Sequence, residues 1–292
     1  THTFMKSFHL ENGLRVVVHY RSSDVLHCGY VLCTGTRHEF PEDSGMAHFI
    51  EHMTFKGTER RRSRQVNDYL ERVGGELNAF TSKQETVYSA TVLRKDFSRA
   101  VDVLTDIVFH SIYPQAEIDK EVEVIIDEID SYRDSPAELI FDEFEQLVYG
   151  DAPLGRDILG NPERLRTYTQ ADALRFTQQH YVPQNAVFYV SGQVELRTII
   201  RHLEKWHGCK LVGDIQEGNT PETDDEEELA QPQNTQPRIV PAAPSLRRVE
   251  RGTHQAHVVM GAPTFSAGDA RRYALTLLNN IGQDAVFNHF SI

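Results

Sequence analysis

Apolar and polar residues alternate with two different periods along most of the chain, which predicts strands and helices in blocks. Short apolar runs bounded by turn residues predict strands at 14–20, 25–33, 76–82, 85–93 and 185–191. Helical patterns follow at 63–73, 97–110, 162–179 and 194–206, with a long helix at 115–149 that is interrupted near Ser135-Pro136. This order predicts an α+β fold, a mostly antiparallel sheet with helices packed on it.

The hydrophobic pattern ends near residue 210 and resumes at Leu246. Residues 214–244 are rich in Glu, Asp, Gln, Asn, Thr and Pro, with few large apolar side chains, so they cannot bury enough surface to fold. The sequence therefore predicts a folded domain at 1–210, an acidic linker at 211–245 and a C-terminal region at 246–292. A strand at 247–261 and a helix at 270–281 are expected there, which is too little for an independent domain.

Another helix is predicted around the stretch His48–His52, because Ser44 reads as a helix N-cap. At about 100° per residue, one face of this helix collects apolar side chains, those of Met46, Phe49, Ile50 and Met53. The opposite face carries His48, Glu51, His52 and Phe55. The helix is therefore expected to bury one face and to present two histidines and a glutamate on the other.

The polar face of this helix has the side chains that a metal-dependent hydrolase needs. Two imidazoles one turn apart can reach one metal ion, and a carboxylate between them can reach a water on that ion. The order His-x-x-Glu-His is the inverted form of the His-Glu-x-x-His zinc signature. On the pentapeptide alone, an amphipathic helix that carries two histidines by chance explains the pattern equally well.

Composition narrows the class of protein without identifying it. The 292 residues are 39% hydrophobic and 25% charged, which is typical of a soluble globular protein. No apolar run approaches the ~18 residues of a membrane span, and the first ten residues lack the apolar core of a signal peptide. We therefore expect no membrane partner and a cytoplasmic location, or a periplasmic one if a leader has been removed. Cys28, Cys33 and Cys209 show no paired spacing and are expected to be buried thiols.

Charge is distributed unevenly along the chain. The net charge of −13 argues against nucleic acid as a partner. Residues 214–237 contain eight acids and no Lys or Arg, and residues 117–145 contain twelve acids against Lys120 and Arg133. The first block fits a solvated tether, whereas the second lies on the long predicted helix.

The acidic helix offers a third metal ligand. Glu121 and Glu128 are seven residues apart, or two turns, so they lie one above the other at the edge of an apolar stripe. The stripe consists of Val122, Ile125, Ile126 and Ile129. A carboxylate near a buried face loses solvation, which a metal ion can compensate. The alternative is an acidic helix face in contact with solvent, as is usual for charges on helices.

Together these segments resemble a known family. The stretch from His48 to Thr58, His-Phe-Ile-Glu-His-Met-Thr-Phe-Lys-Gly-Thr, is similar to the active-site segment of the inverted-zincin peptidases. This is the group of pitrilysin, insulin-degrading enzyme and the β subunit of the mitochondrial processing peptidase. Its third ligand is a Glu about 75 residues beyond the second His, and Glu128 lies at the matching distance from His52. Residues 74–81 and 153–160 match further family segments.

The resemblance implies a role for each candidate residue. His48, His52 and Glu128 would hold Zn²⁺, and Glu51 would be the general base that takes a proton from the attacking water. Glu121 would support a ligand or the water. An exposed edge strand would bind substrate as an added strand through Asn78, Ala79 and Phe80. From the residues alone, this strand is an ordinary sheet element with Phe80 in the core.

The resemblance also implies two similar α+β halves, an active one followed by a degenerate one. Here the segment after Ile281 departs from the family pattern, so we expect the second half to be incomplete. The predicted function is a zinc endopeptidase acting on peptides or unfolded segments, weakly active as this chain alone. A homodimer or a partner subunit would supply the missing half. The alternative is a non-catalytic member that acts as a structural or partner subunit.

Overall fold

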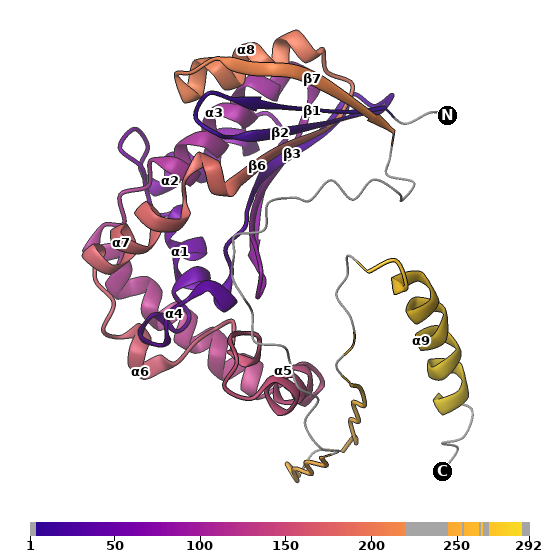
Figure 1. The fold of residues 1–292 in the computed structure, drawn as a ribbon. Coiled ribbons are helices and arrows are strands. Elements are labelled where there is room, and N and C mark those ends of the chain that lie inside the picture. Colours follow the sequence, from indigo (N-terminus) through magenta and orange to yellow (C-terminus); the bar gives the residue numbers. More distant parts are fainter. Residues whose placement is uncertain (1–3, 220–244, 253, 263, 265–268, 288–292) are drawn as a thin grey trace.

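The computed structural model describes residues 4–219, 245–252, 254–262, 264 and 269–287 (Figure 1). Its centre is a seven-stranded sheet in the order β4-β5-β3-β6-β2-β1-β7. The strands are β1 (Phe4–Leu10), β2 (Arg15–Tyr20), β3 (Val25–Leu32), β4 (Glu76–Thr81), β5 (Thr86–Leu93), β6 (Ala186–Gly192) and β7 (Leu211–Asn219). The pair β2–β6 is parallel and the other pairs are antiparallel. The predicted α+β class with a mostly antiparallel sheet is confirmed.

Helices cover one face of this sheet, whereas the other face is turned toward the C-terminal helix (Figure 1). The helices are α1 (Met46–Thr54), α2 (Ser63–Glu71), α3 (Phe97–Phe109), α4 (Gln115–Arg133), α5 (Pro136–Tyr149), α6 (Pro162–Leu165), α7 (Gln170–His180), α8 (Leu196–His207) and α9 (Arg272–Phe287). Short 3-10 turns span Thr36–His38, Pro41–Asp43, Arg94–Asp96, Pro153–Gly155 and Pro183–Asn185. No helix in the described ranges is both long enough and apolar enough to cross a membrane.

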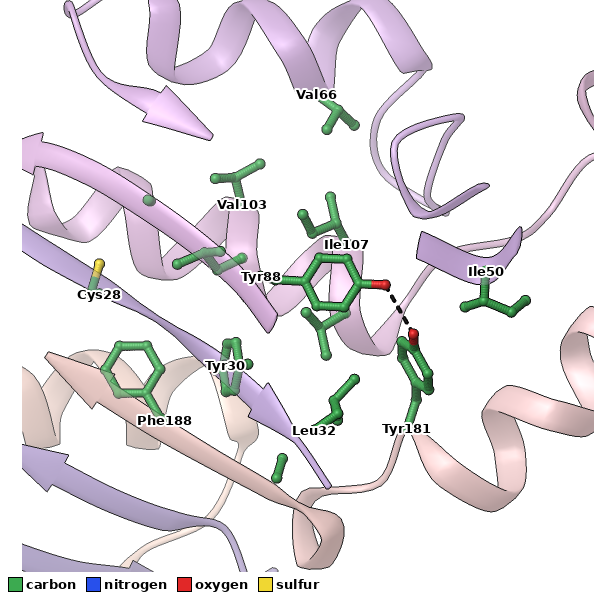
Figure 2. Close-up of a cluster of buried hydrophobic side chains, with 14 of the residues drawn as sticks. Cys28, Tyr30, Leu32, Ile50, Val66, Tyr88, Val103, Ile107, Tyr181 and Phe188 are labelled. Atoms are coloured by element: carbon green, nitrogen blue, oxygen red, sulfur yellow. Dashed lines mark hydrogen bonds between the residues drawn. The ribbon is translucent and has the colours of Figure 1, made fainter. Parts of the chain in front are cut away.

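The core lies between the sheet and the helices, and it ties α1 to the sheet (Figure 2). The hydroxyl groups of Tyr88 on β5 and Tyr181, just after α7, are hydrogen-bonded at 2.9 Å. The Tyr88 hydroxyl also lies 3.1 Å from Oγ1 of Thr54, the last residue of α1. Ile50 points from α1 into the same cluster and is fully buried. These contacts fix the end of the helix that carries the candidate ligands.

Several predicted elements differ from the observed ones in instructive ways. Residues 162–179 form two helices, α6 and α7, because the chain turns between Leu165 and Gln170. Residues 211–219, predicted to begin the linker, instead form β7, which pairs with β1 along the sheet edge. The rest of the predicted linker, 220–244, lies outside the described residues.

The C-terminal region is confirmed only in its helix. The helix expected at 270–281 is observed as α9. The strand expected at 247–261 is not formed in the described part of that range, where it has no partner strand to pair with. Cys28 is buried as expected, but Cys33 is exposed and Cys209 is partly buried, and all three are free thiols.

Candidate metal centre

Helix α1 places both candidate histidines on the face that points away from the core. The apolar residues of its other face, Met46, Phe49, Ile50 and Met53, are completely buried, as predicted. Burial of this face fixes the rotation of the helix, so that the rings of His48 and His52 stack edge to face with centroids 4.6 Å apart. The local sequence pattern therefore sets the relative placement of the two imidazoles.

The entry of α1 is held by a residue that the sequence analysis did not single out. Ser44 does not cap the helix, because the N-cap residue is Gly45 and no N-cap side chain bonds to the first turn. Instead, the buried carboxyl group of Glu39 accepts hydrogen bonds from the N–H groups of Gly45 and Ala47, at 3.0 and 2.8 Å. Gly45 has a φ of +82°, and a Cβ there would lie 2.7 Å from Cα of Gly160, so a side chain cannot be accommodated.

Glu128 on α4 approaches both histidines of α1. Its Oε1 lies 3.9 Å from Nε2 of His48, and its Oε2 lies 3.4 Å from Nε2 of His52. The three ligand atoms all lie within 4.8 Å of one another, and this is the single such group of metal-binding side chains in the described residues. Two imidazole nitrogens and one carboxylate oxygen form a donor set that suits Zn²⁺ and leaves a fourth position for water.

Glu121, which lies two helical turns before Glu128 on α4, orients His52. Its Oε1 lies 3.0 Å from Nδ1 of His52. The carboxylate makes Nδ1 the protonated donor, which leaves the lone pair of Nε2 facing Glu128. The other oxygen of Glu121, Oε2, lies 2.5 Å from Nζ of Lys56. Burial would raise the pKa of Glu121, but the hydrogen bonds from His52 and Lys56 outweigh it, so the pKa is lowered.

The two histidines have opposite electrostatic environments. Burial, together with the neighbouring His52, lowers the pKa of His48 to about 3, so this ring is neutral and can act as a ligand. Its Nδ1 is buried without a hydrogen-bond partner among the described residues, and its Nε2 faces Glu128. Burial also acts to lower the pKa of His52, but the hydrogen bond to Glu121 and the surrounding carboxylates outweigh it and raise that pKa.

Glu51 lies between the two histidines on α1 and is positioned from the sheet. Its Oε2 accepts a hydrogen bond of 2.7 Å from Oγ1 of Thr81 at the end of β4. Burial raises the pKa of Glu51, the Thr81 bond and His52 lower it, and Glu128 raises it further, so that the net direction is upward. A carboxylate with a raised pKa beside a metal site is suited to take up and return a proton.

The cleft beside this site is bordered by the edge strand β4. A pocket of about 230 Å³ is lined by Glu51, His52, Phe55, Lys56, Leu77, Asn78, Ala79 and Glu121. The N–H of Ala79 is bonded to Oδ1 of Asn78 at 2.8 Å and not to the neighbouring strand. Phe80 is 52% exposed, so its alternative placement in the core is wrong, and it does not line this pocket.

The structure therefore brings together all five residues that were predicted for metal binding and catalysis. It adds Lys56 and Thr81, to which the sequence analysis assigned no role. Both lie within or directly beside segments that match the family, Lys56 four residues after His52 and Thr81 at the end of β4. Their spacing alone carries no signal, because each contacts its partner through the tertiary fold.

Two family profiles match this chain. The profile described as insulinase, peptidase family M16, matches residues 15–162. The profile of the peptidase M16 inactive domain matches residues 167–285. The first of these covers His48, His52, Glu121 and Glu128.

Individual relatives agree with the profiles. An uncharacterised zinc protease of Bacillus subtilis is 33% identical over 278 residues, which cover 95% of this chain and 63% of that protein. A probable β subunit of the mitochondrial processing peptidase of Arabidopsis thaliana is 34% identical over 197 residues, 67% of this chain and 37% of the relative. The chain thus spans less than two thirds of the length of each of these relatives.

Solved structures share the fold. A protease from Helicobacter pylori matches with a TM-score of 0.67 at 24% identity, over 70% of this chain and 50% of that one. The periplasmic protease PqqL of Escherichia coli matches with a TM-score of 0.64 at 24% identity, over 68% and 23%. With its site, its profiles and its relatives in agreement, the chain belongs to the insulinase family of peptidases, M16.

Proposed function

We propose that this chain carries the zinc-binding half of an endopeptidase that hydrolyses peptides or unfolded segments. The convergence of His48, His52 and Glu128 on one point, with Glu51 between the histidines, is the observation that carries the proposal. Its relatives are named zinc proteases, which supports the same reaction class.

In the proposed reaction, His48, His52 and Glu128 hold the ion. Zn²⁺ would polarise the scissile carbonyl group and lower the pKa of water beside it. Glu51 takes a proton from the water as its oxygen attacks the carbonyl carbon. Glu51 then returns that proton to the amide nitrogen as the carbon–nitrogen bond breaks, so the carboxylate is regenerated.

Substrate orientation is assigned to β4. As the edge strand of the sheet, it can accept a peptide as an additional strand through its outward backbone groups. Asn78 and Ala79 border the cleft beside Glu51, so a peptide paired there would pass the metal centre. Asn78 must first release the N–H of Ala79, to which its side chain is bonded.

The decisive test is Glu51→Gln, measured for both zinc content and peptide hydrolysis. The amide keeps the shape of the side chain but cannot accept the proton, so we expect zinc to remain and hydrolysis to fall by about 10²–10⁴-fold. Glu71→Gln, an exposed glutamate on α2, is the matched control and should change neither quantity. Unchanged hydrolysis in Glu51→Gln would exclude Glu51 as the general base.

A second function, that of a non-catalytic subunit, has one observation in its favour. Residues 167–285 match the profile of an inactive domain, and such a module would act through a partner subunit. Zinc content separates the two functions, because a purely structural subunit has no need of an ion held by His48, His52 and Glu128. Stoichiometric zinc with hydrolysis that depends on Glu51 supports the endopeptidase, alone or completed by a second copy or a partner.

A further inference from the structure

Lys56 contacts the carboxyl group that supports His52. Its Nζ lies 2.5 Å from Oε2 of Glu121, and the other oxygen of that carboxyl group lies 3.0 Å from Nδ1 of His52. The lysine side chain is 26% exposed, whereas that of Glu121 is only 9% exposed. The three groups form a chain from ammonium to carboxylate to imidazole, and this chain ends at a proposed zinc ligand.

The backbone around Lys56 is held on both sides. Its N–H donates to the carbonyl of Met53 at 3.0 Å, which continues the last turn of α1. Two residues later, the hydroxyl of Thr58 donates to Oδ2 of Asp106 on α3 at 2.8 Å. Because the chain is anchored before and after the lysine, its ammonium group reaches Glu121 from a defined direction.

Glu121 depends on this contact. A carboxylate that is largely removed from water needs hydrogen-bond partners for its oxygens. In the described part of the chain, Lys56 is the one side chain that pairs with Oε2 of Glu121. Without Lys56, Oε2 would find hydrogen-bond partners only if the carboxyl group rotated toward solvent. That rotation would move Oε1 away from Nδ1 of His52.

We propose that Lys56 is a positioning residue of the metal centre, which orients Glu121 so that His52 presents the lone pair of Nε2 to the ion. The inference rests on the proposed function. A carboxylate that accepts Nδ1–H fixes both the tautomer and the ring orientation of a ligand histidine. Lys56 acts one group further out, on the carboxylate itself.

Two other roles for Lys56 make different predictions. Because it lines the cleft, it could instead contact a carboxylate of the substrate, which would raise KM and leave the zinc affinity of the peptide-free protein unchanged. It could also contribute only to folding, which would lower the unfolding midpoint with the zinc affinity unchanged. Zinc affinity measured without substrate therefore separates positioning from both alternatives.

The first experiment measures the zinc dissociation constant by competition with a chromogenic chelator. Loss of a residue that supports a ligand costs about 10–100-fold in metal affinity, so we expect Lys56→Met to weaken zinc binding about tenfold and Lys56→Arg to restore most of it. Lys83→Met is the matched control: Lys83 is also partly buried and ion-paired, with Glu145, but contacts no ligand. It should leave the zinc affinity unchanged.

The second experiment is a double-mutant cycle with Glu121→Gln. If Lys56 acts through Glu121, adding Lys56→Met to Glu121→Gln changes the zinc affinity by less than about twofold. Independent, multiplying losses would overturn the proposal, as would Lys56→Met with zinc affinity equal to that of the parent. Failure of the parent chain to bind zinc would instead refute the proposed function, so the two failures are distinguishable.

Discussion

The carboxyl group of Glu39 accepts a hydrogen bond of 2.8 Å from the N–H of Ala47, the residue directly before His48. The same group accepts a second bond from Gly45. Glu39 is only 4% exposed. Its carboxyl group takes the place of an N-cap side chain, although the residue itself lies outside the helix. The start of the helix that carries two proposed ligands thus depends on a residue in the preceding loop.

Substitution of Glu39 should therefore destabilise the domain. Glu39→Ala leaves two buried N–H groups without an acceptor, which costs about 1–3 kcal/mol of unfolding free energy. Urea unfolding monitored by circular dichroism measures this change in unfolding free energy. Glu42→Ala, an exposed glutamate three residues away, is the control and should change the value by less than about 0.5 kcal/mol. Equal stability of the two variants would contradict the capping role.

One Zn²⁺ should bind per chain, and the affinity of this binding should depend on His52. His52→Ala removes a proposed ligand, and we expect it to lose more zinc affinity than the ~10–100-fold that a supporting residue contributes. Elemental analysis and chelator competition measure stoichiometry and affinity. His27→Ala, an exposed histidine on β3, should bind zinc as the parent does. Undiminished binding by His52→Ala would show that the ligand set is wrong.

Peptide hydrolysis should depend on the outward N–H of Ala79. Proline is tolerated on an edge strand where the N–H faces away from the sheet, so Ala79→Pro should fold and keep its zinc. Because it removes one hydrogen bond to an added strand, worth about 0.5–1.5 kcal/mol, kcat/KM should fall up to about tenfold. Ala79→Ser retains the N–H and is the control. If both variants cleave equally, the substrate does not pair at this position.

Protonation of His207, the last residue of α8, should lower the stability of the protein as the pH falls. Its Nε2 lies 2.8 Å from the hydroxyl of Tyr30, and burial, followed by the charge of His110, lowers its pKa from 6.5 to about 4. A lowered histidine pKa means that the unfolded chain binds the proton more tightly, so stability is present above pH 6.5 and is lost as the pH falls toward 4. Between pH 7 and 5 this loss should be roughly 1–2 kcal/mol.

The difference in unfolding free energy between pH 7 and pH 5 measures this contribution. His207→Gln keeps a polar side chain that does not titrate, so its pH difference should be smaller than that of the parent, whatever its stability at pH 7. His27→Gln removes an exposed histidine and should retain the full difference. A parent-like pH difference in His207→Gln would assign the acid sensitivity to other groups.

Local sequence patterns were sufficient to predict helix α1 and the orientation of its two proposed ligands. The apolar stripe of α1 sets its buried face, and the 3.6-residue period then places His48, Glu51 and His52 on the opposite face. The break between α4 and α5 was also predictable, because Pro136 cannot continue a helix and begins the next one. These features depend on residues a few positions apart, whose relative placement is set by backbone geometry.

Strands at the ends of the sheet were harder to predict. β7 contains two glycines and several polar residues, and it forms a strand because β1 pairs with it near both of its ends. Residues 247–261 were also expected to form a strand from their local pattern, but the described part of this range has no such partner. Strand formation therefore followed the availability of a partner strand more closely than the local propensity.

By itself, the sequence determined which face of α1 holds the histidines, and its resemblance to a family indicated Glu128 and Glu121 as their partners. Only the tertiary structure decided that these two carboxylates of α4 and Thr81 of β4 meet that face. It also placed the carboxyl group of Glu39, from the preceding loop, at the start of the helix. The reason is physical. Helical periodicity is a property of neighbouring residues, whereas a contact across many residues depends on how the buried faces of α1, α4 and the sheet pack together.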